Sequence, residues 1–237
     1  MSQILLVTGG SRGIGAAVCR RAAKEGYSVA VNFHRDLISA NYVVDDITND
    51  GGIAFTVQAD VSLEADIIRM FDEVTERLGA PSGLVNSAGV GGKHMLISDF
   101  EKIELDQLMQ VNVIGTMLCC REASRRMSTQ FGGSGGSIVN VSSMASTIGG
   151  RPGNSAYAAS KAAVDAFTVG FAKEIGTQGI RVNAVRPGVT LTDMTSTVRD
   201  NENVRKNIES TIAMQRTADA DEIAVPILWC LSDEASF

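Results

Sequence analysis

Short apolar segments alternate with longer segments of helical period along the whole chain. Six of the apolar segments predict strands: ILLVT (4–8), SVAVNF (28–33), IAFTVQAD (53–60), GLVNSAG (83–89), GSIVNVSS (136–143) and IRVNAVRPG (180–188). Most of them are apolar at successive positions, which is typical of strands covered by helices on both faces. The segments between them predict helices over 13–25, 36–50, 63–79, 101–130 and 155–178.

This alternation predicts an α/β fold, a single doubly wound Rossmann-type domain over residues 1–237 with a parallel sheet and right-handed crossovers. Ser62 is expected to cap the helix that begins in SLEADIIRMFDEV. The polar segment 190–215 is expected to form a mobile lid over the substrate site. ILWCLSDEASF, at the end of the chain, predicts a helix that continues to the last residue.

Composition narrows the choice of partners. The chain is 44% hydrophobic and 20% charged, and its net charge of −6 disfavours nucleic acid and anionic membranes as partners. The N-terminus resembles no signal peptide, and no run of about 18 apolar residues predicts a membrane span. We therefore expect a cytoplasmic protein. Four cysteines without CxxC spacing and two isolated histidines predict no metal site.

A glycine-rich segment connects the first predicted strand to the first predicted helix. In LLVTGGSRGIGAAVCRRAA (5–23), Gly9, Gly13 and Gly15 lie where the backbone must turn and approach a ligand closely. The first turn of the following helix would present N–H groups and a positive dipole end to a phosphate. The segment predicts a dinucleotide-binding site.

Charge near the expected ribose favours NADP(H) over NAD(H). The second predicted strand has Asn32 where an NAD-binding site usually has an acid, with Arg35 shortly after it and Arg12 in the glycine loop. Two guanidinium groups suit a 2′-phosphate, which arginine binds in bidentate fashion. The alternative is that both arginines are solvated surface charges, with Asp36 neutralising Arg35.

Two further strand ends carry candidate contacts. Asp60 and Val61 follow the third strand, where a carboxylate and an apolar wall could hold adenine. NSAG (86–89) ends the fourth strand, at the edge where open α/β sheets bind ligands. A different pair, Tyr157 and Lys161, would lie one turn apart on one helix face, among small residues. A phenol beside an ammonium can serve as a proton donor near neutral pH, although such pairs are also common on surfaces.

Five motifs in order, TGGSRGIG (8–15), NSAG (86–89), SS (142–143), YAASK (157–161) and RPGVTLT (186–192), make the chain resemble the short-chain dehydrogenase/reductase family over nearly its whole length. The resemblance implies four catalytic residues, namely Asn112, Ser143, Tyr157 and Lys161, with Ser142 a weaker candidate for the serine. It implies that the cofactor is held by Gly9, Ser11, Arg12, Gly13, Ile14, Gly15, Asn32, Arg35, Asp60, Val61, Asn86, Ala88, Gly89, Tyr157, Lys161, Pro187, Gly188, Val189, Thr190 and Thr192.

The same resemblance implies the chemistry. Tyr157 would exchange a proton with a carbonyl oxygen, its phenolate favoured by the neighbouring ammonium, while Ser143 holds that oxygen. Lys161 would also hold the nicotinamide ribose, and Asn112 would tie it to a water path for protons. The implied activity is NADP(H)-dependent reduction of a ketone, or the reverse, as in 3-oxoacyl-thioester reductases and sugar or polyol dehydrogenases. A catalytically silent NADP(H) sensor is the alternative, although such a protein should lack Tyr157 or Lys161.

Several positions bear on substrate and assembly. Gln178 stands where a carrier-binding reductase could use a basic residue, which together with the negative charge slightly disfavours a dedicated fatty-acid role. His94, Met95 and Met194 are possible substrate contacts. Ser87 replaces an asparagine of the family motif, and the gap between Ser143 and Tyr157 is slightly wide. The family's seventh strand is expected to be missing from this sequence, and a homo-oligomer (dimer or tetramer) is implied.

Overall fold

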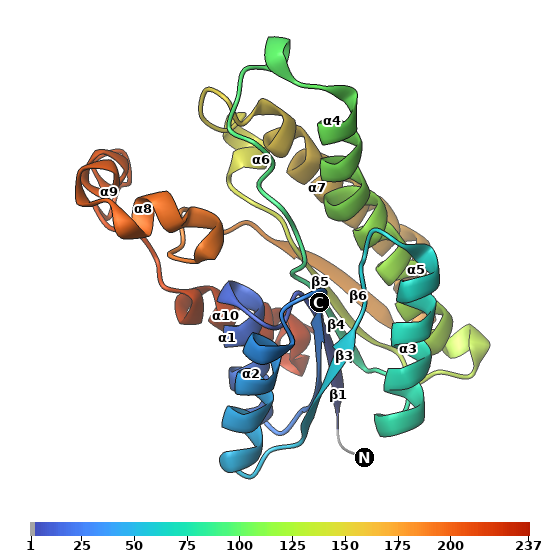
Figure 1. Cartoon of the computed structure of the whole chain (residues 1–237). Helices are drawn as coiled ribbons and strands as arrows, with labels where there is room; N and C mark the ends of the chain where they lie inside the picture. Colours follow the sequence, from blue (N-terminus) through green and yellow to red (C-terminus); the bar gives the residue numbers. More distant parts are fainter. Residues whose placement is uncertain (1–2) are drawn as a thin grey trace.

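A six-stranded parallel sheet runs through the centre of the molecule (Figure 1). The computed structural model describes residues 3–237. The strands are β1 (Ile4–Thr8), β2 (Ser28–Phe33), β3 (Ala54–Gln58), β4 (Gly83–Asn86), β5 (Gly136–Val141) and β6 (Ile180–Val185). They lie in the order β3-β2-β1-β4-β5-β6. Successive strands are therefore added in one direction from β1 to β3 and in the opposite direction from β4 to β6, and this reversal falls between β1 and β4. Ligands of doubly wound sheets bind at the carboxyl ends of the strands beside such a reversal. The predicted α/β fold is confirmed.

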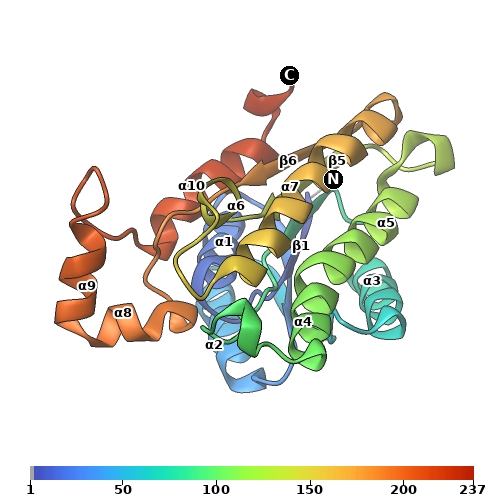
Figure 2. The same cartoon turned by 90° about the horizontal axis from the view of Figure 1, so that it is seen from above.

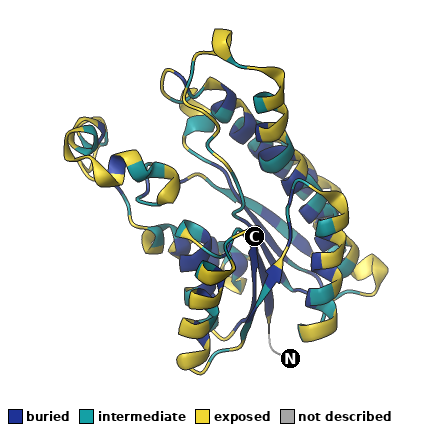
Figure 3. Cartoon of the chain, viewed as in Figure 1, coloured by how far each residue is buried: buried dark blue, intermediate teal, exposed yellow. Residues whose placement is uncertain are grey.

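Helices cover both faces of the sheet, as Figure 2 shows from above. On one face α1 (Gly13–Lys24), α2 (Leu37–Asn49) and α10 (Ala220–Leu231) enclose one apolar core. On the other face α3 (Glu64–Leu78), α5 (Thr116–Met127) and α7 (Ser155–Ile175) enclose a second core. The strands between these layers are mostly buried (Figure 3), which explains their nearly continuous apolar sequences. None of the described helices is long and apolar enough to cross a membrane.

The predicted helix over 101–130 is one continuous path with an irregular centre. It consists of α4 (Lys102–Met109), a π-helical turn (Gln110–Gly115), α5 and a 3-10 turn (Thr129–Phe131). π-helical turns inside α-helices are frequent at functional sites, and this one contains Asn112. A Cβ added to Gly115 would lie 2.5 Å from the carbonyl oxygen of Val61, so glycine permits the close approach of this turn to the end of β3.

Segment 190–215 folds into short helices that stand apart from the sheet (Figure 1). It includes a 3-10 turn (Asp193–Thr195), α8 (Ser196–Asp200) and α9 (Glu202–Glu209). A parallel bridge connects Thr190, at the start of this segment, to Ala218, which lies shortly after its end. This arrangement suits a lid, whose mobility stays a prediction.

Two predictions about helix ends were wrong. Helix α3 begins at Glu64 with Leu63 at the N-cap position, because both the N–H and the hydroxyl of Ser62 donate to Asp60 Oδ1. Helix α10 ends at Leu231, and a separate 3-10 turn follows it. It stops there because Arg181 of β6 donates to the last carbonyl groups of α10 and to that of Ser232.

Candidate active site

The glycine loop between β1 and α1 is shaped by backbone contacts. Gly9 has φ +63°, and a Cβ added there would lie 2.8 Å from Ala88 Cα. A Cβ added to Gly15 would lie 2.3 Å from the carbonyl oxygen of Gly9. Neither position can carry a side chain without displacing the loop. Arg12, the N-cap residue of α1, makes no side-chain capping hydrogen bond, so the first N–H groups of the helix are available to an anion.

Asn32 supports this loop from below instead of facing a ligand. Its Oδ1 accepts a hydrogen bond from the Gly9 N–H at 3.1 Å. Its Nδ2 lies within hydrogen-bonding distance of the carbonyl oxygens of Phe33, Val57 and Ala59. The side chain is only 2% exposed. The predicted cofactor contact through the Asn32 side chain is therefore corrected to a supporting role, because these backbone groups use its hydrogen-bonding capacity.

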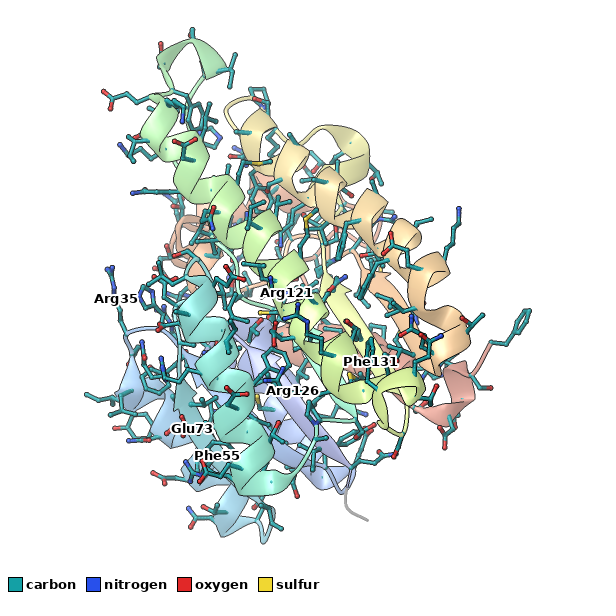
Figure 4. All side chains as sticks on the ribbon, turned by 90° about the vertical axis from the view of Figure 1, so that its right-hand side faces the viewer. Arg35, Phe55, Glu73, Arg121, Arg126 and Phe131 are labelled. Atoms are coloured by element: carbon teal, nitrogen blue, oxygen red, sulfur yellow. The ribbon has the colours of Figure 1, made fainter. Side chains whose placement is uncertain are left out.

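The two arginines near the expected ribose differ in their partners. Arg12 pairs with Asp193 at 3.4 Å. Arg35 projects from the surface (Figure 4), and no ion pair forms at this residue within the described part of the chain. Asp36 accepts hydrogen bonds from the N–H and hydroxyl of Ser39, which lower its pKa. Asp36 thus caps α2 and does not form an ion pair with Arg35.

Asp60 and Val61 lie where β3 ends, as predicted. Asp60 Oδ1 accepts the two hydrogen bonds from Ser62, and Oδ2 lies 3.2 Å from His34 Nε2. Val61 is buried. The hydrogen bonds from Ser62 hold the Asp60 carboxylate in place. The contact of Asp60 and Val61 with adenine stays a prediction.

The turn after β4 is anchored by a residue that sequence reasoning missed. Thr8 Oγ1 accepts hydrogen bonds from the N–H groups of Ser87 and Ala88, each at 3.2 Å. Nothing in the sequence links Thr8 to a turn about 80 positions away. The Asn86 side chain donates to Asn140 Oδ1 at 2.9 Å and contacts Cys120 Sγ. The Asn86 side chain therefore has a structural role between β4, β5 and α5, and the predicted contact of this residue with a cofactor stays a prediction.

Ser143, Tyr157 and Lys161 come together where β5 ends and α7 begins. Burial raises the pKa of Tyr157, and a hydrogen bond with the Ser143 side chain partly offsets this rise. Lys161 Nζ lies 5.9 Å from the centre of the Tyr157 ring and donates to the carbonyl oxygen of Val141 at 2.8 Å. Burial lowers the pKa of Lys161 to about 8. The expected lowering of the pKa of Tyr157 by Lys161 is not found, since burial dominates and the amine is directed at Val141.

Asn112, from the π-helical turn, completes the group. Its amide exchanges two hydrogen bonds with the backbone of Val90, at 2.8 and 2.9 Å, and donates a third to Ser160 Oγ at 3.1 Å. A Cβ added to Gly89 would lie 3.3 Å from Asn112 Oδ1 and 3.5 Å from Lys161 Nζ. The turn after β4, the π-helical turn and α7 therefore meet at one point. Ser160 was not predicted, although it lies beside Lys161 in the YAASK motif.

The segment after β6 lies against both the serine loop and the glycine loop. Pro187 accepts a hydrogen bond from the Met144 N–H at 2.9 Å. A Cβ added to Gly13 would lie 3.1 Å from Thr192 Cγ2. Thr190 is buried, whereas Thr192 is partly exposed. Four other predicted cofactor residues lie in these loops: Ser11 and Ile14 at the glycine loop, and Gly188 and Val189 in the segment after β6. Their binding roles stay predictions.

The similarity of the chain to known proteins extends over its whole length. A family profile described as enoyl-(acyl carrier protein) reductase matches residues 9–237. The chain is 44% identical to the uncharacterized oxidoreductase YgfF of Escherichia coli, over 99% of this chain and 94% of that protein. It is 34% identical to the 3-oxoacyl-[acyl-carrier-protein] reductase FabG of Staphylococcus aureus, over 100% of this chain and 94% of that protein. The chain belongs to the short-chain dehydrogenase/reductase family. It is therefore related to oxidoreductases, as the motifs indicated.

A solved short-chain dehydrogenase supports the same assignment. The structure, from Burkholderia cenocepacia and in complex with NADP, matches with a TM-score of 0.89 and 34% identity. The match covers 97% of this chain and 90% of that one.

The three predicted substrate contacts lie in the loops around the serine and tyrosine of this short-chain dehydrogenase/reductase. The Met95 N–H donates to the carbonyl oxygen of Gly153 at 3.1 Å. A Cβ added to Gly153 would lie 2.7 Å from the His94 ring, and one added to Gly91 would lie 3.6 Å from Met194 Cγ. His94 and Met194 are exposed. Contact with a substrate stays a prediction for all three.

Proposed function

We propose that this chain is an NADP(H)-dependent reductase that converts a ketone to a secondary alcohol, or catalyses the reverse reaction. The observation that carries the proposal is the meeting of Ser143, Tyr157 and Lys161 beside the glycine loop, with Asn112 supporting them. A proton donor, a group to hold the carbonyl oxygen and a cation are thus next to a dinucleotide-binding turn.

The residues around the glycine loop fit an NADP(H) molecule. Backbone atoms of Ala88 and Gly9 fill the space where side chains at Gly9 and Gly15 would lie, so these glycines let the loop pack tightly before α1. The first N–H groups of α1 are then free to receive a pyrophosphate. Arg35 lacks a described ion-pair partner, and Arg12 has only an exposed one, so both can turn to a 2′-phosphate. The relative from Burkholderia cenocepacia, described as a complex with NADP, supports this choice. When bound, the nicotinamide supplies or accepts the hydride.

The side chains of the site then carry out the proton transfer. The raised pKa of Tyr157 keeps its phenol protonated at neutral pH, so it can give that proton to the carbonyl oxygen as the carbon is reduced. Ser143, hydrogen-bonded to Tyr157, is placed to hold the same oxygen. To stabilise the phenolate that remains, the Lys161 ammonium would have to turn from the Val141 carbonyl oxygen toward Tyr157, because in this structure it does not lower the pKa of Tyr157. Asn112 fixes the distance between the turn at Val90 and α7.

The substrate class stays open between 3-oxoacyl thioesters and sugar- or polyol-derived carbonyls. The identity to FabG supports the former. The arginines that could meet an acidic carrier, however, are already paired: Arg121, Arg125 and Arg126 of α5 converge on Glu122, which is 4% exposed. Figure 4 shows Arg121 and Arg126 on this helix, beside α3. These ion pairs favour a free substrate over a carrier-bound one.

The test follows consumption of NADPH, with NADH in parallel, over a panel of carbonyls. The panel holds an acetoacetyl thioester, small ketones, diketones and oxidised sugars, with a crotonyl thioester for the enoyl reduction that the family description names. Tyr157→Phe should lower turnover about 1,000-fold, since a positioned acid contributes about 100- to 10,000-fold, while NADPH still binds through the other predicted cofactor contacts. Tight NADPH binding by the wild type with no turnover on any substrate would instead support the silent sensor.

A second pair of variants tests the cofactor preference. Arg35→Ala should raise the KM for NADPH about tenfold and leave the KM for NADH unchanged, which corresponds to the loss of about 1.4 kcal/mol of binding free energy. Lys173→Ala removes an exposed cation from α7, far along the helix from the site, and is the matched control. A wild-type preference for NADH would contradict the NADP(H) proposal.

A further inference from the structure

Asp165 is a nearly buried carboxylate on the same face of α7 as Tyr157 and Lys161. It follows Lys161 by one helical turn, and its side chain is 13% exposed. Aspartate is rarely buried unless it is paired. The direct proton exchange proposed above does not use it, so its burial calls for another explanation.

The contacts of Asp165 join it to two other segments. Its Oδ2 accepts from Arg186 Nε at 2.8 Å. Burial raises the pKa of Asp165, but hydrogen bonds with Ser146, Arg186 and Ser142 outweigh this, and the net pKa is lowered. The hydroxyls of Ser142 and Ser146 lie close enough to the carboxylate to lower its pKa. In this structure, however, they donate to the carbonyl oxygens of Lys161 and Ser143, so Asp165 Oδ1 is buried without a hydrogen-bond partner of good geometry.

These segments carry the proposed machinery. Ser142 and Ser146 flank Ser143, and Arg186 directly precedes the loop that begins at Pro187. The Met144 N–H donates to the carbonyl oxygen of Pro187, so the serine loop and the cofactor loop also contact each other. Asp165 therefore lies where the serine loop, the cofactor loop and α7 converge.

Asp165 is also the charged residue that acts on the pKa of Lys161. Among the described residues, the uncharged groups around the amine are the Val141 carbonyl, Asn112 and Gly89. The titratable neighbours on α7 are Tyr157 and Asp165, with Arg186 of the cofactor loop behind Asp165. Burial lowers the pKa of Lys161, and Asp165 is the charged side chain that raises it. The neighbouring helix α6 (Ala145–Ile148) carries no charged residue.

We infer that Asp165 is a positioning residue: its carboxylate ties the serine loop and the cofactor loop to α7, and its charge keeps the buried Lys161 an ammonium. The catalytic consequence rests on the proposed function, whereas the charge of Lys161 can be measured without any substrate. Asp165 is not expected to touch the substrate, because Lys161 and the serine loop separate it from the Tyr157 hydroxyl.

The test titrates Lys161 directly by NMR. The chain has six lysines, Lys24, Lys93, Lys102, Lys161, Lys173 and Lys206, so [ε-13C]lysine gives a simple spectrum in which Lys161→Arg assigns one signal. Asp165→Asn should lower the pKa of Lys161 by about one unit, the lower end of the shifts that nearby charges cause. Arg186→Gln breaks the same ion pair but keeps the carboxylate, so it should leave that pKa unchanged or raise it.

The contrast between the two variants separates charge from structure. Equal lowering in both variants, or no change in Asp165→Asn, would overturn the inference. If Asp165→Asn does not fold, the double variant Asp165→Asn/Arg186→Gln leaves no charge of the pair unbalanced and should also lower the pKa of Lys161. In the kinetic arm, the alkaline limb of kcat/KM should move to lower pH in Asp165→Asn only. Absence of turnover in the wild type would contradict the proposed function and leave the NMR result to decide on Asp165.

Discussion

Burial of the Lys161 amine lowers the stability of the folded protein at neutral pH. The pKa of Lys161 falls from 10.5 to about 8 because the folded protein removes the amine from water. The unfolded chain therefore binds more protons than the folded chain between about pH 8 and 10.5, and the contribution of Lys161 to stability rises with pH across this window. Below about pH 8 the full destabilisation, about 3 kcal/mol, is present.

Replacement of this lysine should stabilise the protein while it removes the activity. Lys161→Met should raise the free energy of unfolding at pH 7 by about 2 kcal/mol, because the lost hydrogen bond to Val141 offsets about 1 kcal/mol of the relief. The gain should shrink as the pH approaches 9, since the wild-type amine then loses its proton. Urea unfolding at both pH values measures this difference, with the exposed Lys173→Met as control. A variant less stable than the wild type at both pH values would show that the hydrogen bond outweighs the desolvation.

At the scale of elements, the helices around the site owe their limits to residues far away in the chain. Helix α10 stops at Leu231 because the guanidinium of Arg181, on β6, donates to three carbonyl oxygens at 2.8 to 3.1 Å. The π-helical turn at Asn112 approaches β3 because Gly115 has no side chain to keep Val61 away. Each case combines a local sequence feature with a partner from another element.

The loss of Arg181 should therefore loosen the end of α10. Arg181→Met should lower the free energy of unfolding by about 2 kcal/mol, as expected when hydrogen bonds to a charged donor are lost. Amide exchange should speed up in the last turn of α10 before it does elsewhere in the helix. Lys206→Met, which removes an exposed ion pair with Glu202 on α9, should change stability by less than about 0.5 kcal/mol. Equal effects of the two substitutions would argue against a special role for Arg181.

At the scale of the whole molecule, the sheet brings segments from the entire chain to one edge. The glycine loop, the turn after β4, the serine loop and the start of segment 190–215 all lie there, although they are far apart in sequence. Thr192 approaches Gly13, and Asp193 pairs with Arg12. The predicted lid is thus connected to the glycine loop through two neighbouring residues.

This connection predicts a response of the lid to the cofactor. Saturating NADPH should slow hydrogen exchange in α8 and α9 by about tenfold or more, since ligands stabilise the segments that close on them. Arg12→Ala should weaken both NADPH binding and this protection, because Arg12 is a proposed contact of the 2′-phosphate and also pairs with Asp193 at the start of the lid. The carboxyl end of α2, remote from the loop, is the internal control. Unchanged exchange over 190–215 would contradict the lid.

The sequence by itself determined the strand and helix order, the parallel sheet and the glycine loop, which follow from local patterns: apolar runs, helical spacing, and glycines within a few residues of one another. The grouping of Ser143, Tyr157 and Lys161 was implied by the resemblance of the motifs to the short-chain dehydrogenase/reductase family. The α/β prediction and the family assignment rest on such patterns, and both are confirmed.

Only the tertiary structure decided which polar side chains support the site instead of facing a ligand. Asn32 and Asn86 look like ligand contacts in sequence, yet backbone groups and Asn140 use their amides. No structural role was predicted for Thr8 or Asp165, although each joins segments that are distant in the chain. The physical reason is the same in all four cases: most buried polar groups are hydrogen-bonded, and which partners a side chain reaches becomes known only when the elements are packed.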